Sequence, residues 1–260
     1  MSDDLALALR LADAADAITS DRFRAAGLRV DVKPDRSFVT DSDLATEQAL
    51  RDLLRRERPS HGVAGEEFGE QGDSEWRWHL DPIDGTTNFA RGVPVWATLI
   101  ALRHLDEPVC AVVSAPALQR RWWASRGAGA HSGGGRLQVS RVAALDDAYL
   151  SSTDVRDFDR GGLGGYQALA ARCRTVRALG DFWSHMLVAE GVIDLGLDPI
   201  VKPWDLAAPQ LIVEEAGGRF SDLRGGRRID SGDALTSNGL LHEAALALLR
   251  SNSGRQIESL

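Results

Sequence analysis

The sequence predicts a single α/β domain, because apolar patterns typical of strands and of helices follow one another along the chain. Apolar and polar residues alternate over residues 76–80 and predict a strand that ends at Asp81. Residues 206–218 form a strongly helical run that stops at Gly217 and Gly218. The chain has 260 residues, of which 43% are hydrophobic, and this is enough for a large core.

The same patterns predict further elements along the chain. Helices are expected near the N-terminus and over residues 44–57, 166–172, 182–190 and 242–250, and strands around Cys110 and over 192–197. Trp122 and Trp123 predict an edge strand that meets a partner, and the glycines between 127 and 135 predict a hairpin turn. Gly161 to Gly165 predict a mobile linker with room for a lid, and Cys110 and Cys173 have no metal or redox spacing.

The segment DPIDGTTNF, residues 81–89, has the features of a metal site. The predicted strand delivers Asp81, and the turn that follows allows Asp81, the Ile83 carbonyl and Asp84 to point into one pocket. Hard cations such as Mg²⁺ prefer oxygen ligands of this kind. The sequence therefore predicts a metal site at the end of this strand.

A phosphate site is predicted directly after the second aspartate. Backbone amides of Gly85, Thr86 and Thr87 lie where a helix is expected to begin, and free amides at a helix start bind phosphate. Asp, Pro and Gly are also the residues that ordinary surface turns prefer. On this segment alone, the interpretation as a simple turn stays open.

More carboxylates lie upstream and downstream of this segment. Glu66 and Glu67 follow a short apolar stretch, and we expect Glu66 to contact the metal. Asp205 lies where the helical run after Trp204 begins. An aspartate at this position also caps helices without any metal, so both interpretations of Asp205 remain.

Three motifs together resemble the inositol monophosphatase superfamily. They are GEE at 65–67, DPIDGTTNF at 81–89 and WDLAAPQLIVEEAGG at 204–218, in the order in which the family has them. The resemblance extends to about residue 250. It implies the layered αβαβα sandwich of the inositol monophosphatase and fructose-1,6-bisphosphatase type, with halves at about 1–140 for metal and phosphate and 141–250 for substrate. A frayed tail is expected over residues 251–260.

The resemblance implies a Mg²⁺ site with two or three ions, in which Mn²⁺ is a possible substitute. One ion is expected on Glu66, Asp81 and the Ile83 carbonyl, and a second on Asp81, Asp84 and Asp205. Four carboxylates and a phosphate dianion carry about six negative charges, which two or three divalent cations balance. Lithium sensitivity is also implied.

The expected mechanism is direct hydrolysis, in which a metal-activated water attacks phosphorus in line with the leaving alkoxide. By resemblance, Thr86 and Asp43 activate this water together with the metal ligand Glu66. Asp43 also fits a helix cap for residues 44–57, and the two roles are compatible. Lys33 is expected on a loop over the metals.

The leaving group is expected to contact Asp84, Asp205 and two aspartates of the second half. These are Asp181 and Asp198, and additional carboxylates suit a substrate with a cationic tail. The segment from Gly180 to Pro199 resembles the histidinol-phosphatase branch, which implies L-histidinol phosphate as substrate, with Phe182 or Trp183 beside the imidazole. Asp181 also fits the N-cap of helix 182–190.

Other functions remain open from sequence. A broad inositol 1-phosphate or fructose 1,6-bisphosphate phosphatase and a 3′(2′),5′-bisphosphate nucleotidase use the same phosphate and metal residues. From a different class, the chain fits a non-catalytic binding or scaffold protein that kept the fold. Retention of every expected metal ligand argues against this last alternative.

Charge and hydropathy limit the partners. A net charge of −8 and a pI near 5.3 argue against nucleic acid or an anionic membrane surface. No stretch approaches the ~20 apolar residues of a membrane span, and acidic residues stand where a signal peptide has basic ones. We therefore expect a cytoplasmic enzyme that acts on a small phosphate ester, and the resemblance implies a homodimer.

Overall fold

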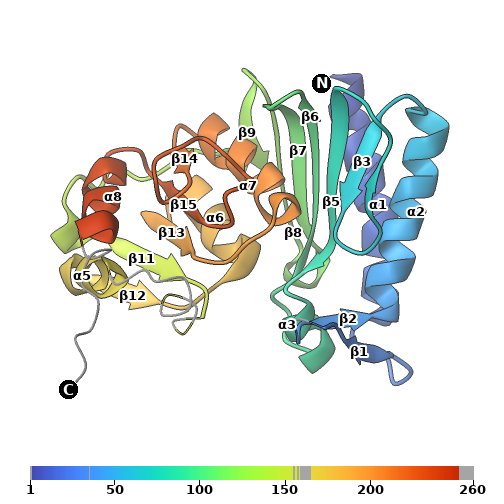
Figure 1. Cartoon of the computed structure of the whole chain (residues 1–260), viewed down its shortest axis with the longest axis horizontal. Helices are drawn as coiled ribbons and strands as arrows, with labels where there is room; N and C mark the ends of the chain where they lie inside the picture. The colour runs from blue at the N-terminus through green and yellow to red at the C-terminus, as the bar shows by residue number, and fades with distance from the viewer. Residues whose placement is uncertain (1, 35, 155, 157, 159–164, 252–260) are drawn as a thin grey trace.

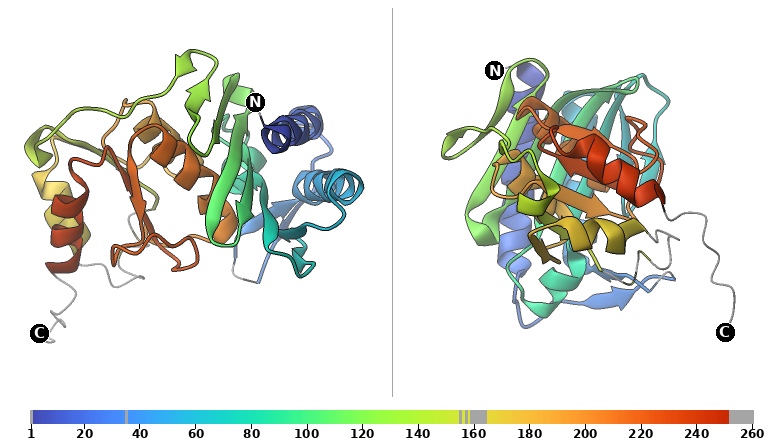
Figure 2. Two further views of the ribbon diagram at one scale, coloured as in Figure 1. Left: turned by 90° about the horizontal axis from the view of Figure 1, so that it is seen from above. Right: turned by 90° about the vertical axis from the view of Figure 1, so that its left-hand side faces the viewer.

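The computed structural model consists of five layers of alternating helices and sheets (Figure 1). It describes residues 2–34, 36–154, 156, 158 and 165–251. Helices α1 and α2 cover one face of a large sheet, α6 and α7 lie between this sheet and a smaller one, and α5 and α8 cover the smaller sheet (Figures 1 and 2). The predicted αβαβα sandwich is confirmed.

The helices follow the predicted positions closely. They are α1 (Asp3–Arg22), α2 (Asp41–Glu57), α3 (Thr86–Arg91), α5 (Gly165–Arg172), α6 (Asp181–Ala189), α7 (Pro203–Glu215) and α8 (His242–Ser251). Two short 3₁₀ turns, Pro116–Leu118 and Leu145–Asp147, connect strands. Among the described residues, no helix is both long and apolar enough to cross a bilayer.

The large sheet has eight strands in the order β10-β9-β8-β7-β6-β5-β3-β4. Its strands are β3 (Gly62–Gly65), β4 (Gly69–Gln71), β5 (Trp76–Asp84), β6 (Ala97–His104), β7 (Glu107–Ala115), β8 (Arg120–Ser125), β9 (Gly129–Ser132) and β10 (Gly135–Arg136). All neighbours are antiparallel except β3 and β5. A separate hairpin of β1 (Val30–Val32) and β2 (Phe38–Thr40) leads into α2.

The small sheet has five strands in the order β12-β11-β13-β15-β14. They are β11 (Tyr149–Ser152), β12 (Thr175–Arg177), β13 (Leu195–Asp198), β14 (Arg219–Ser221) and β15 (Ala234–Ser237). Strand β13 is parallel to β11 and antiparallel to β15. The C-terminal residue of β13 is Asp198, so the end of this interior strand carries an acidic side chain. Its charge acts on Asp84 of the first half.

Three apolar cores hold the layers together. Trp78 and Leu80 of β5 are fully buried against α1 and α2, as the alternation in the sequence predicts. The opposite face of the large sheet packs on α6 and α7, and the small sheet packs on α5 and α8. These cores fix the ends of β5, β13 and α7, which carry the acidic residues.

The prediction of an edge strand at Trp122 and Trp123 is wrong. These residues belong to β8, which pairs with β7 on one side and β9 on the other. Trp122 is 0% exposed and donates its indole N–H to Glu190 Oε1 at 2.5 Å. The glycine-rich hairpin that follows supplies β9 and β10, and this addition moves β8 into the sheet.

Two predictions lie mainly outside the described residues. The linker predicted at 161–165 overlaps the structure only at Gly165, the first residue of α5. The tail predicted over residues 251–260 overlaps it only at the last residue of α8.

Candidate active site

Strand β5 delivers the first group of site residues where its pairing with β6 is interrupted. Asp81 pairs with Leu99 and Asp84 with Ala97, so the register shifts between the two aspartates. Asp81 Oδ1 accepts a hydrogen bond from the Ile83 N–H at 3.0 Å. This bulge takes residues 82 and 83 out of the ladder, and α3 begins two residues after Asp84.

Gly85 connects this bulge to α3 in a conformation that suits glycine. Its φ is 85°, and a Cβ at this position would lie 3.1 Å from the Val95 carbonyl oxygen and 3.4 Å from Asp181 Oδ2. The carboxylate of Asp181 therefore lies beside the predicted phosphate amides of Gly85, Thr86 and Thr87.

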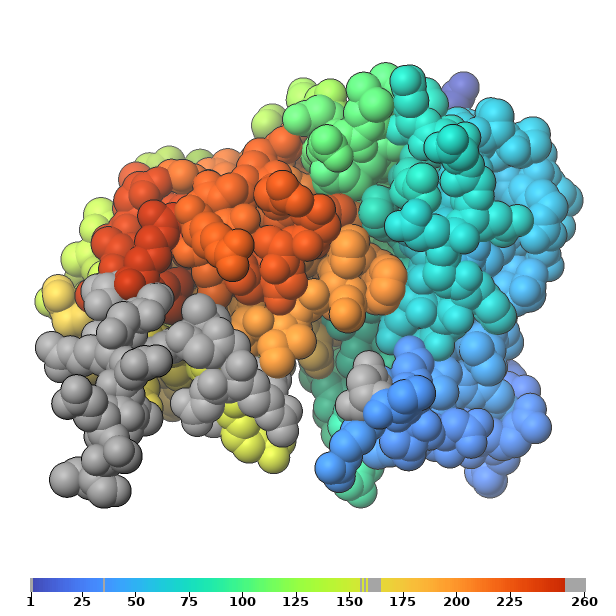
Figure 3. Space-filling view, in the orientation of Figure 1, coloured from blue at the N-terminus to red at the C-terminus, as the bar shows by residue number. Residues whose placement is uncertain are grey.

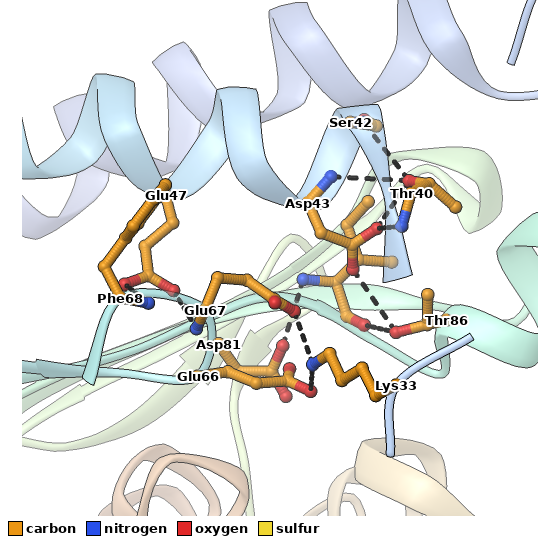
Figure 4. Close-up of polar contacts among 11 residues, drawn as sticks. Lys33, Thr40, Ser42, Asp43, Glu47, Glu66, Glu67, Phe68, Asp81 and Thr86 are labelled. Carbon is orange, nitrogen blue, oxygen red and sulfur yellow. Dashed lines mark hydrogen bonds and ion pairs between the residues drawn. The ribbon is translucent and has the colours of Figure 1, made fainter. Parts of the chain in front are cut away.

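Thr86 and Asp43 are in contact, although 43 positions separate them in the sequence (Figure 4). Thr86 Oγ1 lies 3.3 Å from Asp43 Oδ1 and 3.0 Å from the Ile83 carbonyl oxygen. The other oxygen of Asp43 accepts the Thr40 N–H at 2.9 Å, because Thr40 is the N-cap of α2 and Asp43 its third residue. One carboxylate thus stabilises the helix start and holds the threonine hydroxyl.

Glu66 and Glu67 lie on the turn between β3 and β4, which Glu47 of α2 holds in place (Figure 4). The buried Glu47 carboxylate accepts the N–H of Glu67 at 2.7 Å and that of Phe68 at 3.2 Å, and Arg51 donates to it at 2.7 Å. Sequence analysis missed Glu47, because the i, i+4 spacing of Glu47 and Arg51 is equally typical of a solvated helix face.

Lys33 extends from the β1–β2 hairpin onto this turn (Figure 4). Its Nζ lies 2.8 Å from Glu66 Oε1 and 2.7 Å from Glu67 Oε1. Burial acts to lower the pKa of Lys33, but the bonds to both glutamates raise it overall. A positive group is thus already attracted to the position predicted for a cation.

Asp84 and Asp205 come from different layers. Asp84 Oδ2 accepts the backbone N–H of Phe182 at 2.6 Å. Asp205 is the third residue of α7, not its N-cap, and its Oδ2 accepts the Lys202 N–H at 2.8 Å. Each residue keeps a second carboxylate oxygen.

The carboxyl groups of this site strongly disfavour full ionisation. Burial, followed by neighbouring carboxylates, raises the pKa of Asp81 and of Asp84 well above the ordinary value of 3.8. Burial also raises the pKa of Asp205 to about 7 and that of Asp43 to about 6. Burial first, and then the neighbouring negative charges, thus favour the protonated forms of these carboxyl groups.

The donor set fits a hard divalent cation. All predicted ligands are oxygens. In each of the four carboxylates, one oxygen accepts from an N–H or ammonium group and the second oxygen takes no part in that bond; these residues are Glu66, Asp81, Asp84 and Asp205. As they stand, no three acidic, histidine or cysteine side chains among the described residues already surround one point as a ligand set. Asp81 and Asp205 are close enough to share a side-chain hydrogen bond, which acts to lower the pKa of Asp205 against the larger effect of burial.

The predicted substrate residues of the second half lie close to the same site. Asp181 is the first residue of α6, with φ 49°, and Gly180 takes the N-cap position, so the capping interpretation of Asp181 is wrong. Asp198 is 2% exposed and, through its charge, raises the pKa of Asp84, Asp181 and Asp205 in addition to burial. In Figure 3 the surface is notched between the blue N-terminal hairpin region and the orange part of the chain.

The predicted aromatic contact at Phe182 is wrong. Its side chain is 1% exposed and packs in the core, with its ring centroid 6.2 Å from that of Trp122. Trp183 is only partly buried and makes an edge contact with Trp122 at 5.9 Å. Of the two candidates, Trp183 keeps exposed ring surface.

His185 is a second residue that sequence analysis missed. It lies four positions after Asp181 on α6, which places both residues on one helix face. Its Nε2 lies 2.7 Å from Asp198 Oδ2 and its Nδ1 2.8 Å from Thr236 Oγ1. The spacing from Asp181 is a signal in the sequence that could have indicated it.

Buried acidic oxygens from both halves lie next to a threonine hydroxyl and a helix start. This arrangement suits phosphate ester hydrolysis with metal ions, and it defines the class as that of the metal-dependent phosphatases. Residues 1–254 match the model of the inositol monophosphatase family, and the chain belongs to this family.

Curated relatives and solved structures agree with this assignment. A histidinol-phosphatase of Mycobacterium tuberculosis is 51% identical over 254 residues, which cover 95% of this chain and 98% of the relative. One of Streptomyces coelicolor is 49% identical, with 95% and 97% covered. The inositol monophosphatase TM1415 of Thermotoga maritima superposes with a TM-score of 0.86 at 29% identity, covering 95% of this chain and 97% of that structure.

Proposed function

We propose that this chain is a histidinol-phosphatase, which hydrolyses L-histidinol phosphate to L-histidinol and phosphate. Two relatives that carry this name are 49% and 51% identical over nearly the whole chain. The single structural observation that carries the proposal is the close approach of the Asp181 carboxylate to Gly85. A Cβ atom added to Gly85 would lie 3.4 Å from Asp181 Oδ2. This carboxylate suits a leaving group with an ammonium.

The proposed cofactor is Mg²⁺, with two or three ions and Mn²⁺ as a substitute. Glu66, Asp81, the Ile83 carbonyl, Asp84 and Asp205 would hold it. When bound, the metal supplies charge neutralisation for the phosphate and lowers the pKa of water. The uncompensated acidity of the site supports this proposal.

The proposed roles in hydrolysis fall to Thr86 and Asp43, next to Glu66. The Thr86 hydroxyl lies within 3.3 Å of Asp43 Oδ1, and Asp43 has its other oxygen fixed at the start of α2. A fixed acceptor keeps the hydroxyl oriented, so that its oxygen can accept a hydrogen bond from the attacking water, and as it takes up the water proton its own proton can pass to Asp43. Gly85, Thr86 and Thr87 would donate backbone N–H groups to the phosphate oxygens.

The proposed leaving-group contacts are Asp84, Asp205, Asp181 and Asp198. The ammonium of L-histidinol would contact Asp181 and Asp198, because Asp198 is close enough for its charge to raise the pKa of Asp181 in addition to burial. Trp183 is the remaining candidate for the imidazole. A homodimer in the cytoplasm completes the proposal, and this part rests on the family resemblance in the sequence.

The test is phosphate release with Mg²⁺ from L-histidinol phosphate, inositol 1-phosphate, fructose 1,6-bisphosphate and adenosine 3′,5′-bisphosphate. We expect kcat/KM for L-histidinol phosphate to exceed the others by about a hundredfold or more, equivalent to about 2.7 kcal/mol of discrimination. Comparable values for the inositol and fructose esters would make the enzyme a generalist. Equal release by wild type and Asp84→Asn would exclude catalysis at this site.

A further inference from the structure

Asp198 is held on one side only. Its Oδ2 contacts His185 Nε2 at 2.7 Å, while its Oδ1 is buried and has no hydrogen-bond partner within the part of the chain that the structure describes. A buried acceptor without a partner costs free energy unless another group satisfies it. The unpaired oxygen therefore indicates a donor that arrives from outside the chain.

His185 is itself fixed at both ring nitrogens. It is 1% exposed, and its Nδ1 contacts the hydroxyl of Thr236, which is fully buried on β15. The small residue Gly196 makes room for this contact, since a Cβ there would lie 2.7 Å from Thr236 Oγ1 and 3.3 Å from His185 Nδ1. The ring cannot turn without losing both bonds, so it fixes the direction of the Asp198 carboxylate.

We propose that His185 is a positioning residue for substrate selectivity: it holds Asp198 Oδ2 so that Oδ1 accepts a hydrogen bond from an ammonium group on the alcohol part of the phosphate ester. This inference rests on the proposed function and adds the residue that orients Asp198 toward the ammonium. The charges of Asp198 and His185 both act on Asp181, one turn before His185 on α6, whose pKa is raised to about 6 mainly by burial. The three groups therefore form one recognition unit.

The experiment compares two substrates that differ only in the amino group. They are L-histidinol phosphate and its deamino analogue, 3-(imidazol-4-yl)propyl phosphate, assayed with Mg²⁺. The quantity measured is the ratio of their kcat/KM values, which we name the amine preference. Wild type is expected to favour the amine strongly, and His185→Leu to lower the amine preference by about tenfold or more, the range for a hydrogen bond to a charged group.

Two further variants show whether His185 acts through Asp198. Asp198→Asn should lower the amine preference by a similar factor, and the double variant with His185→Leu should lower it no further. His185→Gln can still donate to Asp198 and should restore the amine preference to within about threefold of wild type. Additive losses in the double variant would overturn the proposal.

His242 provides a matched control in the same half. It is fully buried, and its nitrogens contact Ser221 Oγ and Ser237 Oγ at 2.8 Å each, without a carboxylate. His242→Leu should lower the melting temperature and keep the amine preference. An equal loss of amine preference in this variant would reduce the role of His185 to general stability and overturn the proposal.

The outcomes separate the inference from the proposed function. A wild type that fails to hydrolyse L-histidinol phosphate removes the proposed function. A wild type that hydrolyses both esters equally overturns the inference and the proposed ammonium contacts, but leaves the phosphatase activity in place. A His185→Leu variant that keeps the amine preference overturns the inference alone. If His185→Leu fails to fold, Thr236→Val removes the Nδ1 contact, together with a long hydrogen bond of 3.4 Å from the Thr236 hydroxyl to the Gly196 carbonyl oxygen, and leaves His185 in place. We expect this variant to lower the amine preference, and an unchanged value overturns the proposal.

Discussion

The carboxylate of Asp84 accepts the backbone N–H of Phe182, with 2.6 Å between Oδ2 and N. Asp84 ends β5, an interior strand of the large sheet, and Phe182 lies in the first turn of α6, which packs on the small sheet. A predicted metal ligand of the first half thus contacts the helix that carries the predicted substrate residues. Metal and substrate residues are joined by one hydrogen bond.

Asp84→Asn should separate the electrostatic role of this residue from its structural one. The amide oxygen can still accept the Phe182 N–H, but a negative charge is removed from a group of repelling carboxylates. We expect kcat/KM to fall by at least about a hundredfold, and the melting temperature without metal to rise. The stabilisation that Mg²⁺ gives to wild type should disappear. A variant that Mg²⁺ stabilises as strongly as wild type would contradict the assignment of Asp84 as a ligand.

The raised pKa values predict an unusual pH dependence of stability without metal. The pKa of Asp205 is raised to about 7 and that of Asp43 to about 6, from 3.8, mainly by burial. Folding therefore favours the protonated forms, and this contribution is lost as the pH rises through 6 and 7. In EDTA, the melting temperature should fall between about pH 5 and about pH 7 and level off above that. Stabilisation by Mg²⁺ should be larger at the higher pH. A melting temperature in EDTA that rises over this range would refute the prediction.

Glu47 should matter for both the stability of the fold and the binding of metal, although it lies outside the sequence motifs that carry the predicted metal ligands. It is fully buried, pairs with Arg51 and holds the turn of Glu66 and Glu67. Glu47→Gln leaves Arg51 without its carboxylate, and breaking a buried pair costs about 3–5 kcal/mol. We expect a lower free energy of unfolding and a weaker Mg²⁺ affinity by calorimetry. Glu57 lies on the same helix as Glu47 and makes an exposed ion pair with Arg10 of α1. Glu57→Gln breaks this pair and should cost about 1 kcal/mol or less. Equal losses in the two variants would contradict this role.

The fold was predictable because its main signals are local. The alternation before Asp81 and the glycine stop after α7 each depend on neighbouring residues, and both elements form as expected. The position of β8 depends on which strands follow it, and so the edge assignment of Trp122 failed. The starts of α2 and α6 were predicted within a few residues, but the residues at the N-cap positions were not. Thr40 and Gly180 are the N-caps, instead of Asp43 and Asp181.

The candidate site was predictable where a motif joins the residues, and less so where packing does. Thr86 and Asp43 were paired by family resemblance, and the structure brings them within 3.3 Å. Glu47 and His185 carry no motif, because their roles depend on complete burial and on partners in other elements. Burial of a polar side chain is a tertiary property that helix periodicity does not supply.

Gly85→Ala should test whether the turn after Asp84 tolerates any side chain. Its φ is 85°, and the added Cβ would lie 3.1 Å from the Val95 carbonyl oxygen and 3.4 Å from Asp181 Oδ2. Gly127 has φ 72° with no atom within 4 Å of a Cβ, so Gly127→Ala carries only the backbone cost of about 1–2 kcal/mol. We expect Gly85→Ala to lose more stability than Gly127→Ala, and to lower kcat/KM for L-histidinol phosphate by at least about tenfold. Gly127→Ala should keep wild-type kinetics. If both variants kept full activity, close approach at Gly85 would have no part in placing the phosphate beside Asp181.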